Sequence, residues 1–401
     1  VYCLSNYWKA ESYFKQKNYK DALKYYNEFL KNSAAYSLRE FPYAYYGIGY
    51  CYYNLKNYIE AISSFRKFIT YTTLELDKQK LADAYNRLGD CYLYSKNYNA
   101  AVEFYERSIK LGTYETDYAF FYKAITLGLI EKPFDKIEQL KKLIKTYPSS
   151  GYIIEAYYEL GTTLFEIKNY DEALNYFMII VDNYKFSIYY PKSLVSIGLI
   201  YYNIDQYEKA ITYLKQVIEE FPETEDTKAA LNILRNVYIE LNNPDEYYSY
   251  VKNKNIKTYK ISETEQDSIT YIVAENLYMQ GKYKEATEKF NLYLNKFPRG
   301  NFLSNAYFYL GDCYYRNKEY NKALENFEKI ISGSYSPFKE QALLLAGRIN
   351  YQQNQYRNAI NYFNKLIEIS ANKKILQEAQ ITLMRCYYYT EDYENAAKIA
   401  D

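Results

Sequence analysis

An internal repeat constrains the fold of this chain more than any other feature. Its clearest copy, LSNAYFYLGDCYYRNKEYNKALENFEKI, begins at Leu303. Apolar residues follow spacings of three and four on each side of a polar break, which predicts two short helices with one apolar face each. Joined by a tight turn, such helices form a helical hairpin. Gly311 and Ala323 indicate where the helices cross, because larger side chains would push the backbones apart.

The same register recurs eleven times, at intervals of 35 to 40 residues. We name the position of Ala323 the B marker, and the position twelve residues earlier the A marker. The B markers are Ala22, Ala61, Ala101, Lys136, Ala173, Ala210, Tyr247, Ala286, Ala323, Ala359 and Ala396. The A markers are Ala10, Gly49, Gly89, Ala124, Gly161, Gly198, Arg235, Ala274, Gly311, Gly347 and Met384. One hairpin cannot bury its own apolar face, so neighbouring hairpins must stack into a solenoid.

The register resembles the tetratricopeptide repeat family, in the long-repeat form of bacterial cell-envelope proteins. The matching residues of the fifth copy are Tyr157, Leu160, Gly161, Tyr170, Ala173 and Phe177. The resemblance implies an all-α, right-handed solenoid of about eleven helix-turn-helix hairpins. It also implies a location in the bacterial envelope, in the periplasm. The unpaired cysteines favour the cytoplasm as the alternative.

Two copies depart from the register. The fourth has Lys136 at its B marker, and the seventh has Arg235 and Tyr247 at its two markers, followed by a polar stretch. A hairpin that cannot close tightly should pack loosely on its neighbours. We therefore predict repeats 1 to 7 over residues 1–252, a hinge or long loop over 253–264, and repeats 8 to 11, the last truncated, over 265–401. One continuous solenoid is the alternative. Neither end of the sequence is a polar cap, which suggests a piece of a larger polypeptide or complex.

Composition argues against catalysis. The chain has no histidine, so it can build neither a Ser-His-Asp triad nor a histidine metal site. It also has no phosphate-binding glycine loop. The formal net charge of +1 gives no nucleic-acid footprint, and no apolar run is long enough to span a membrane. The sequence thus predicts no enzyme, and no catalytic, cofactor-binding or metal-binding residue.

Four of the five cysteines share one repeat position, two residues after the A marker: Cys51, Cys91, Cys313 and Cys386. A shared position indicates a small residue buried beside the helix crossing. Equivalent positions in adjacent hairpins should lie about 8–10 Å apart, and a disulfide needs Cα atoms within about 7 Å. We therefore expect free, structural thiols.

Aromatic residues form two rows on the first helix of the hairpins. We name positions four residues after the A marker the turn row, and positions three residues before it the crossing row. The resemblance implies that both rows face the concave groove, where they could bind partner segments together with two arginines. The predicted groove residues are Tyr46, Tyr53, Tyr158, Phe165, Tyr202, Tyr271, Tyr278, Phe308, Tyr315, Arg348, Tyr351, Arg385 and Tyr388. The alternative is that the rings pack between neighbouring helices and that the arginines are only solvated.

The predicted function is a non-catalytic scaffold that docks peptide or helical segments of other proteins on this Tyr-rich groove. Tyrosine suits such contacts, since it offers a large area, few rotatable bonds and a hydroxyl group. One alternative is a structural arm of a larger complex. Another is a module that binds glycan or peptidoglycan, because aromatic troughs also stack on sugar rings.

Overall fold

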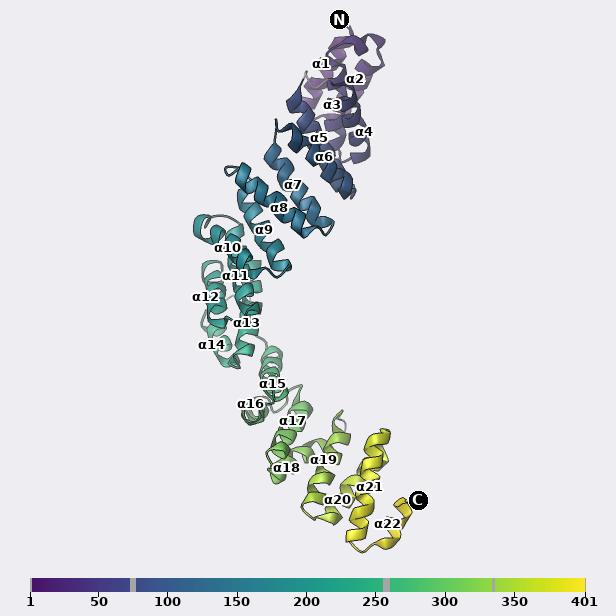
Figure 1. The fold of residues 1–401 in the computed structure, drawn as a ribbon, viewed down its shortest axis with the longest axis vertical. Coiled ribbons are helices and arrows are strands. Elements are labelled where there is room, and N and C mark those ends of the chain that lie inside the picture. Colours follow the sequence, from purple (N-terminus) through teal and green to yellow (C-terminus); the bar gives the residue numbers. More distant parts are fainter. Residues whose placement is uncertain (1, 73–76, 255–259, 334–335, 401) are drawn as a thin grey trace. The chain divides into compact units, whose positions relative to one another are not determined.

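The chain forms an all-helical array of hairpins. The computed structural model describes residues 2–72, 77–254, 260–333 and 336–400. Within these ranges there are twenty-two α-helices, one short 3₁₀ helix and no β-strand (Figure 1). The helices alternate as the A and B helices of eleven hairpins, which confirms the predicted helical-repeat solenoid.

The first six hairpins pair α1 (Tyr2–Lys15) with α2 (Tyr19–Lys31), α3 (Glu40–Asn54) with α4 (Tyr58–Tyr71), α5 (Lys78–Tyr94) with α6 (Tyr98–Leu111), α7 (Thr116–Leu129) with α8 (Pro133–Thr146), α9 (Ile153–Glu166) with α10 (Tyr170–Asn183), and α11 (Tyr189–Asn203) with α12 (Tyr207–Glu220). The 3₁₀ helix η1 (Ser33–Ser37) lies between α2 and α3. The other five pair α13 (Glu225–Glu240) with α14 (Pro244–Lys254), α15 (Glu263–Met279) with α16 (Tyr283–Lys296), α17 (Leu303–Arg316) with α18 (Tyr320–Ile331), α19 (Lys339–Gln352) with α20 (Tyr356–Ile369), and α21 (Lys373–Tyr389) with α22 (Tyr393–Ala400).

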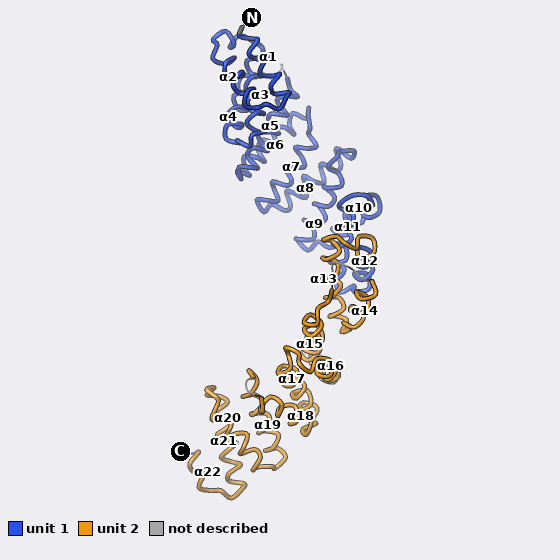
Figure 2. The backbone as a smooth tube through the Cα atoms, turned by 180° about the vertical axis from the view of Figure 1, so that it is seen from behind, with its two compact units in different colours: residues 1–217 blue, residues 218–401 orange. Residues whose placement is uncertain are grey.

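The array divides into two compact units, residues 1–217 and 218–401 (Figure 2). Within each unit a B helix packs on the A helix that follows it, as α4 does on α5 and α16 on α17. Each stretch of core is therefore built by nearest neighbours along the chain. The predicted hinge at 253–264 includes residues 255–259, which lie outside the described residues, so the hinge stays a prediction.

Every A helix ends in the same turn, including those of the two divergent copies. The residue seven positions after the A marker has a φ between 54° and 76° in all eleven hairpins, and only Gly281 among them is a glycine. The backbone N–H of the next residue donates to a carbonyl five residues earlier, as Glu319 does to Tyr314 at 2.9 Å. This is a Schellman turn, which satisfies the last carbonyls of the helix. The fourth and seventh copies thus keep the turn although their markers depart from the register.

The helix crossings confirm the role of the small A markers. A Cβ atom on Gly89 would lie 2.5 Å from the Tyr105 ring, and one on Gly311 would lie 2.6 Å from the Phe327 ring. Each ring stands four residues after a B marker, one turn along helix B, and each is fully buried. A glycine on helix A thus makes room for an aromatic ring on helix B.

The fourth hairpin closes in spite of its lysine B marker. The Lys136 side chain crosses the face of α7 at Gly128, where a Cβ atom would lie 3.0 Å from Cδ of the lysine. Glycine at that point leaves room for the aliphatic part of the lysine. The seventh hairpin differs, because its B marker is the fully buried Tyr247. There α13 and α14 touch over fewer residues than α15 and α16 do.

Candidate partner-binding surface

The turn row holds eight aromatic rings at the end of the A helices. Each contacts the aromatic residue that begins helix B of its own hairpin, with ring centroids 5.5 to 6.2 Å apart. The eight rings are Phe14, Tyr53, Phe165, Tyr202, Tyr278, Tyr315, Tyr351 and Tyr388. Seven are half-buried and Tyr388 is exposed. The paired rings bracket the Schellman turn, so the turn row keeps one orientation from hairpin to hairpin.

The crossing row lies in the packing between helices. Phe308 contacts Phe327 of its own helix B at 6.2 Å and stacks on Phe338 of the following connection at 4.6 Å. Tyr271 has the same two contacts, with Phe290 and with Phe302. Tyr158 has the corresponding contacts, with Phe177 and with Tyr189. The Tyr46 ring contacts Phe65 and Phe68, which both lie on helix B of its own hairpin. The rings of Tyr158, Tyr271 and Phe308 therefore join their hairpins to the next element, and partner contact by this row stays a prediction.

Tyrosine hydroxyls from these rows bind carboxylates on the next A helix. Tyr53 Oη donates to Asp90 at 3.3 Å, and Tyr278 Oη donates to Asp312 at 2.6 Å. Both acceptors follow directly after an A marker and are buried. These pairs were not predicted from the sequence. The sequence does contain a signal for them. In both pairs the tyrosine stands in the turn row of one hairpin, and the aspartate directly follows the A marker of the next hairpin.

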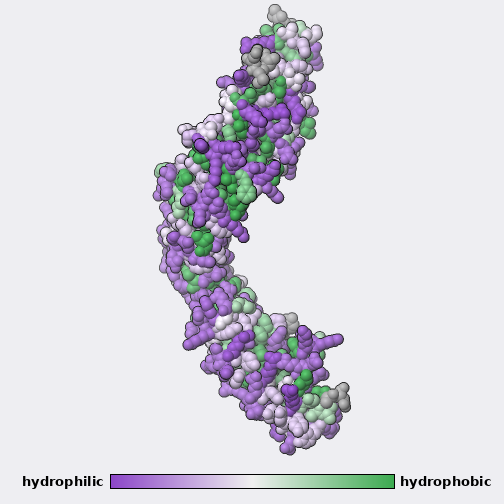
Figure 3. Space-filling model, in the orientation of Figure 1, coloured by the Kyte–Doolittle hydropathy of each residue, from purple (hydrophilic) through white to green (hydrophobic). Residues whose placement is uncertain are grey.

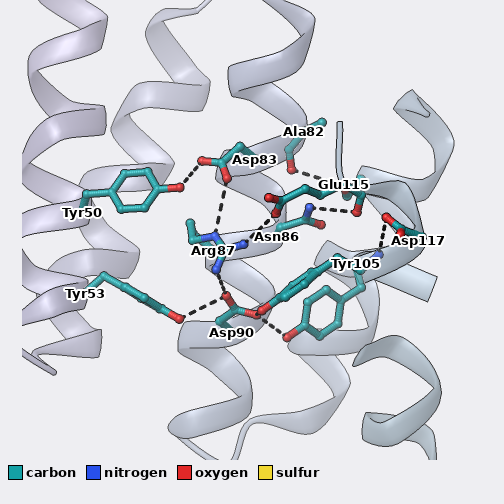
Figure 4. A network of polar contacts seen from close by, with 12 residues as sticks. Tyr50, Tyr53, Ala82, Asp83, Asn86, Arg87, Asp90, Tyr105, Glu115 and Asp117 are labelled. Atoms are coloured by element: carbon teal, nitrogen blue, oxygen red, sulfur yellow. Dashed lines mark hydrogen bonds and ion pairs between the residues drawn. The ribbon is translucent and has the colours of Figure 1, made fainter. Parts of the chain in front are cut away.

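One such cluster joins four helices of the first unit (Figure 4). Asp90 accepts hydrogen bonds from Tyr105 and from Tyr118, each at 2.7 Å, in addition to Tyr53. The Arg87 guanidinium lies 2.6 Å from Asp90 and 3.2 Å from Glu115. Burial raises the pKa of the Asp90 carboxyl, against the opposing effects of Arg87 and the tyrosine hydroxyls.

Asp83, on the same helix, accepts the hydroxyl hydrogens of Tyr46 and Tyr50. The Arg87 side chain is only 13% exposed, so little of this cluster faces solvent. The carboxylates are thus occupied by donors from the chain itself. The cluster holds α3, α5, α6 and α7 in register rather than offering a free site.

The two arginines of the predicted groove have different surroundings. Arg348 on α19 forms an ion pair with Glu378 on α21, so its charge is already neutralised. Arg385 on α21 is exposed and makes no ion pair with any described residue. Binding of a partner by both arginines stays a prediction, and of the two only Arg385 has a guanidinium without an ion-pair partner among the described residues.

Arg385 lies in a pocket of about 350 Å³ that gathers three of the predicted groove residues. The lining residues are Tyr351, Met384, Arg385, Tyr388, Tyr389 and Ala396. The Tyr388 side chain is 61% exposed. A volume of this size suits one side chain or a small ligand. Elsewhere, the face drawn in Figure 3 intersperses hydrophobic and hydrophilic residues.

The cysteines are buried free thiols, as the sequence predicted. Burial raises the pKa of Cys51 and of Cys91 to about 12, which keeps both in the unreactive thiol form. No cluster of metal-ligating side chains occurs in the part of the chain that the structure describes. Nor does any described helix have the length and apolar character needed to cross a bilayer.

Two family models, both described as tetratricopeptide repeat, match the chain. One covers residues 40–112 and 302–372, the other residues 5–34, 155–187 and 192–224. Together they cover more than half of the sequence. The chain belongs to the tetratricopeptide repeat family. Repeats of this family form scaffolds for protein–protein interaction and are typically non-catalytic.

Solved structures similar to this chain include two that are described as tetratricopeptide repeat proteins. YrrB, "a TPR protein with an unusual peptide-binding site", shares 22% identity over 47% of this chain and 89% of its own, with a TM-score of 0.38. A tetratricopeptide repeat protein from Parabacteroides merdae shares 20% over 67% of this chain and 98% of its own, with a TM-score of 0.35. Pseudomonas aeruginosa pilF shares 16% over 56% and 95%, with a TM-score of 0.39. Comparison with curated proteins gives no match.

Proposed function

We propose that this tetratricopeptide repeat protein binds peptide or helical segments of other proteins through the turn row of its A helices. The observation that carries the proposal is the pairing of all eight turn-row rings with the first residue of helix B. Rings held in one orientation lose little conformational entropy when a partner binds, which favours affinity. These rings are partly exposed, so each of these turns presents an aromatic edge to solvent. Seven of the eight rings belong to the predicted groove.

The pocket around Arg385 sets the chemistry of one such contact. Tyr351 and Tyr388 supply aromatic walls, and the free guanidinium supplies a positive charge. Guanidinium groups bind carboxylates through paired, charge-assisted hydrogen bonds. The occupant we propose is therefore an acidic segment of a partner protein, with a carboxylate next to an apolar side chain. An envelope location belongs to the same proposal and awaits localisation of the tagged protein in its own cells.

A peptide-display selection against the purified chain tests the proposal. We expect the selected peptides to combine Asp or Glu with an apolar residue. Titration calorimetry should then show at least tenfold weaker binding to Arg385→Gln, because a hydrogen bond to a charged group contributes about 1.5–3 kcal/mol. Lys365→Gln is the matched control, since Lys365 is an exposed cation on α20 of the same unit and lies outside the pocket.

The proposed site is refuted if the selected peptides bind Arg385→Gln and Tyr388→Ala as tightly as they bind the parent chain. Binding of soluble peptidoglycan fragments that depends on Tyr388 would instead favour a glycan-binding module. A chain that selects no peptide and binds no glycan would fit a structural arm of a larger complex.

A further inference from the structure

The fourth hairpin lacks the ring pair that the turns of eight other hairpins have. Its turn-row residue is Gly128, and its helix B begins at Pro133. A cavity of about 490 Å³ opens at this turn. The lining residues are Ile125, Gly128, Leu129, Glu131, Pro133, Lys136, Glu159, Thr163, Glu166 and Ile167. The cavity thus occupies the end of the hairpin where two aromatic side chains stand in eight other copies.

Three repeat positions around this space differ from those of most other hairpins. Besides the two missing rings, the B marker is Lys136, whose side chain is only 11% exposed and lies against Gly128. A side chain at position 128 would meet Cδ of the lysine, so the glycine and the lysine depend on each other. The Lys136 ammonium donates to Glu159 Oε2 at 2.7 Å, which fixes the lysine to the next A helix. The volume lies within the range of ligand-binding pockets, about 300–1,000 Å³.

The cavity combines apolar walls with an excess of negative charge. Ile125, Leu129, Pro133 and Ile167 supply the apolar walls. The lining contains three carboxylates, Glu131, Glu159 and Glu166, and a single cation, Lys136, which pairs with Glu159. Glu131 and Glu166 are exposed and form no ion pair with any described residue. Two carboxylates therefore remain for an occupant.

We propose that this cavity binds an arginine or lysine side chain from a segment of a partner protein. Its aliphatic stem would pack on the apolar walls, as long cationic side chains do at apolar surfaces. Its charged head would bind Glu131 and Glu166 by charge-assisted hydrogen bonds. The proposal rests on the scaffold function. It adds a second contact site, which prefers a cation, whereas the Arg385 pocket prefers an anion.

Methyl NMR on the 401-residue chain tests the cavity directly. The probe is the peptide acetyl-Leu-Arg-Leu-amide, and the readout is the shift of the isoleucine methyl groups of Ile125 and Ile167. We expect saturable shifts with this peptide and none when its arginine is replaced by glutamate. The double variant Glu131→Gln with Glu166→Gln should weaken binding at least tenfold. Asp135→Asn should not, because Asp135 is an exposed carboxylate of the same hairpin outside the cavity.

A second variant fills the cavity without removing a carboxylate. Gly128→Tyr, Pro133→Tyr and Lys136→Ala, combined, restore the residues that the other hairpins have at these positions. This triple variant should keep the helical circular-dichroism spectrum and lose the peptide-induced shifts. Unchanged shifts in the triple variant would overturn the proposal, as would equal shifts with a peptide that carries norleucine in place of arginine. Tighter binding of spermidine than of the arginine peptide would also overturn it, in favour of a polyamine site.

The result is separable from that of the display experiment. The Arg385 pocket lies in the second unit and is tested with acidic peptides, whereas this cavity lies in the first unit and is tested with a basic one. If acidic peptides do not bind the Arg385 pocket, the methyl shifts still report on this cavity. If the methyl shifts are absent, binding of acidic peptides at Arg385 is unaffected.

Discussion

Gly161→Ala should destabilise the chain even though alanine is the better helix former. In α9 the added Cβ atom would lie 2.8 Å from the nearest ring atom of Phe177, which is 1% exposed. Carbon atoms pack best at about 3.5–4.0 Å, so the ring or the helix must move by roughly 1 Å. Overpacking of this kind costs about 1–3 kcal/mol, and the gain in helix propensity offsets about 1 kcal/mol. We expect a net loss of up to about 2 kcal/mol.

Gly151→Ala is the matched control, ten residues earlier, in the connection that precedes α9. No atom lies within 4 Å of a Cβ built on Gly151, and its φ is not in the left-handed region. The substitution should be neutral or should stabilise by up to about 1 kcal/mol, because it reduces the entropy of the unfolded chain. The assay is urea unfolding followed by circular dichroism, with hydrogen exchange in α9 and α10 as a local readout. A Gly161→Ala chain as stable as the Gly151→Ala chain would refute the close-crossing argument.

Three further predictions concern the turn, the tyrosines and the thiols. Lys318→Gly should stabilise the chain by about 0.5–1 kcal/mol in urea unfolding, because Lys318 has a φ of 62° and glycine adopts this conformation without strain; an unchanged or lower stability would contradict the turn assignment. Burial raises the pKa of Tyr248 from the ordinary value of 10.0 to about 12, and it raises the pKa of Tyr50 further. The free energy of unfolding should therefore be highest below pH 10 and should fall as the pH rises above it. Absorbance of these tyrosinates while the helical circular dichroism is intact would contradict this. Burial also raises the pKa of Cys313 to about 12 and that of Cys386 to about 11, so a thiol reagent at mildly alkaline pH should react with these cysteines only after denaturant is added.

The hairpins could be predicted because their determinants are local and repeated. Gly311 and Ala323 predicted a close crossing, and the crossing is there because the Phe327 ring fills the space above the glycine. The uniform turn was harder to see. Residues such as Lys318 adopt a positive φ without glycine, so composition gave no signal for it. In these turns the closing hydrogen bonds of the Schellman motif outweigh the residue's own preference.

The candidate surface could be predicted only in part, because it depends on contacts between hairpins. Both rows were recognised as aromatic, but periodicity does not tell an exposed ring from one such as Phe308, which stacks on the next connection. The ion pair of Arg348 with Glu378 likewise joins two hairpins, between residues that lie 30 positions apart in the sequence. Lys136 was recognised as a departure from the register, yet the cavity beside it required the position of Gly128. Such features follow from the side chains of neighbouring elements and not from one helix.

In the proposed function, partner proteins touch the turn row. Photo-crosslinking residues placed singly at Tyr315, Tyr351 and Tyr388 test this in the native cell, with Lys322 and Lys365 as exposed control sites on B helices. We expect the turn-row sites to capture a common partner protein, identified by mass spectrometry, and the two lysine sites to capture none. Capture from the lysine sites alone, or from no site, would contradict it.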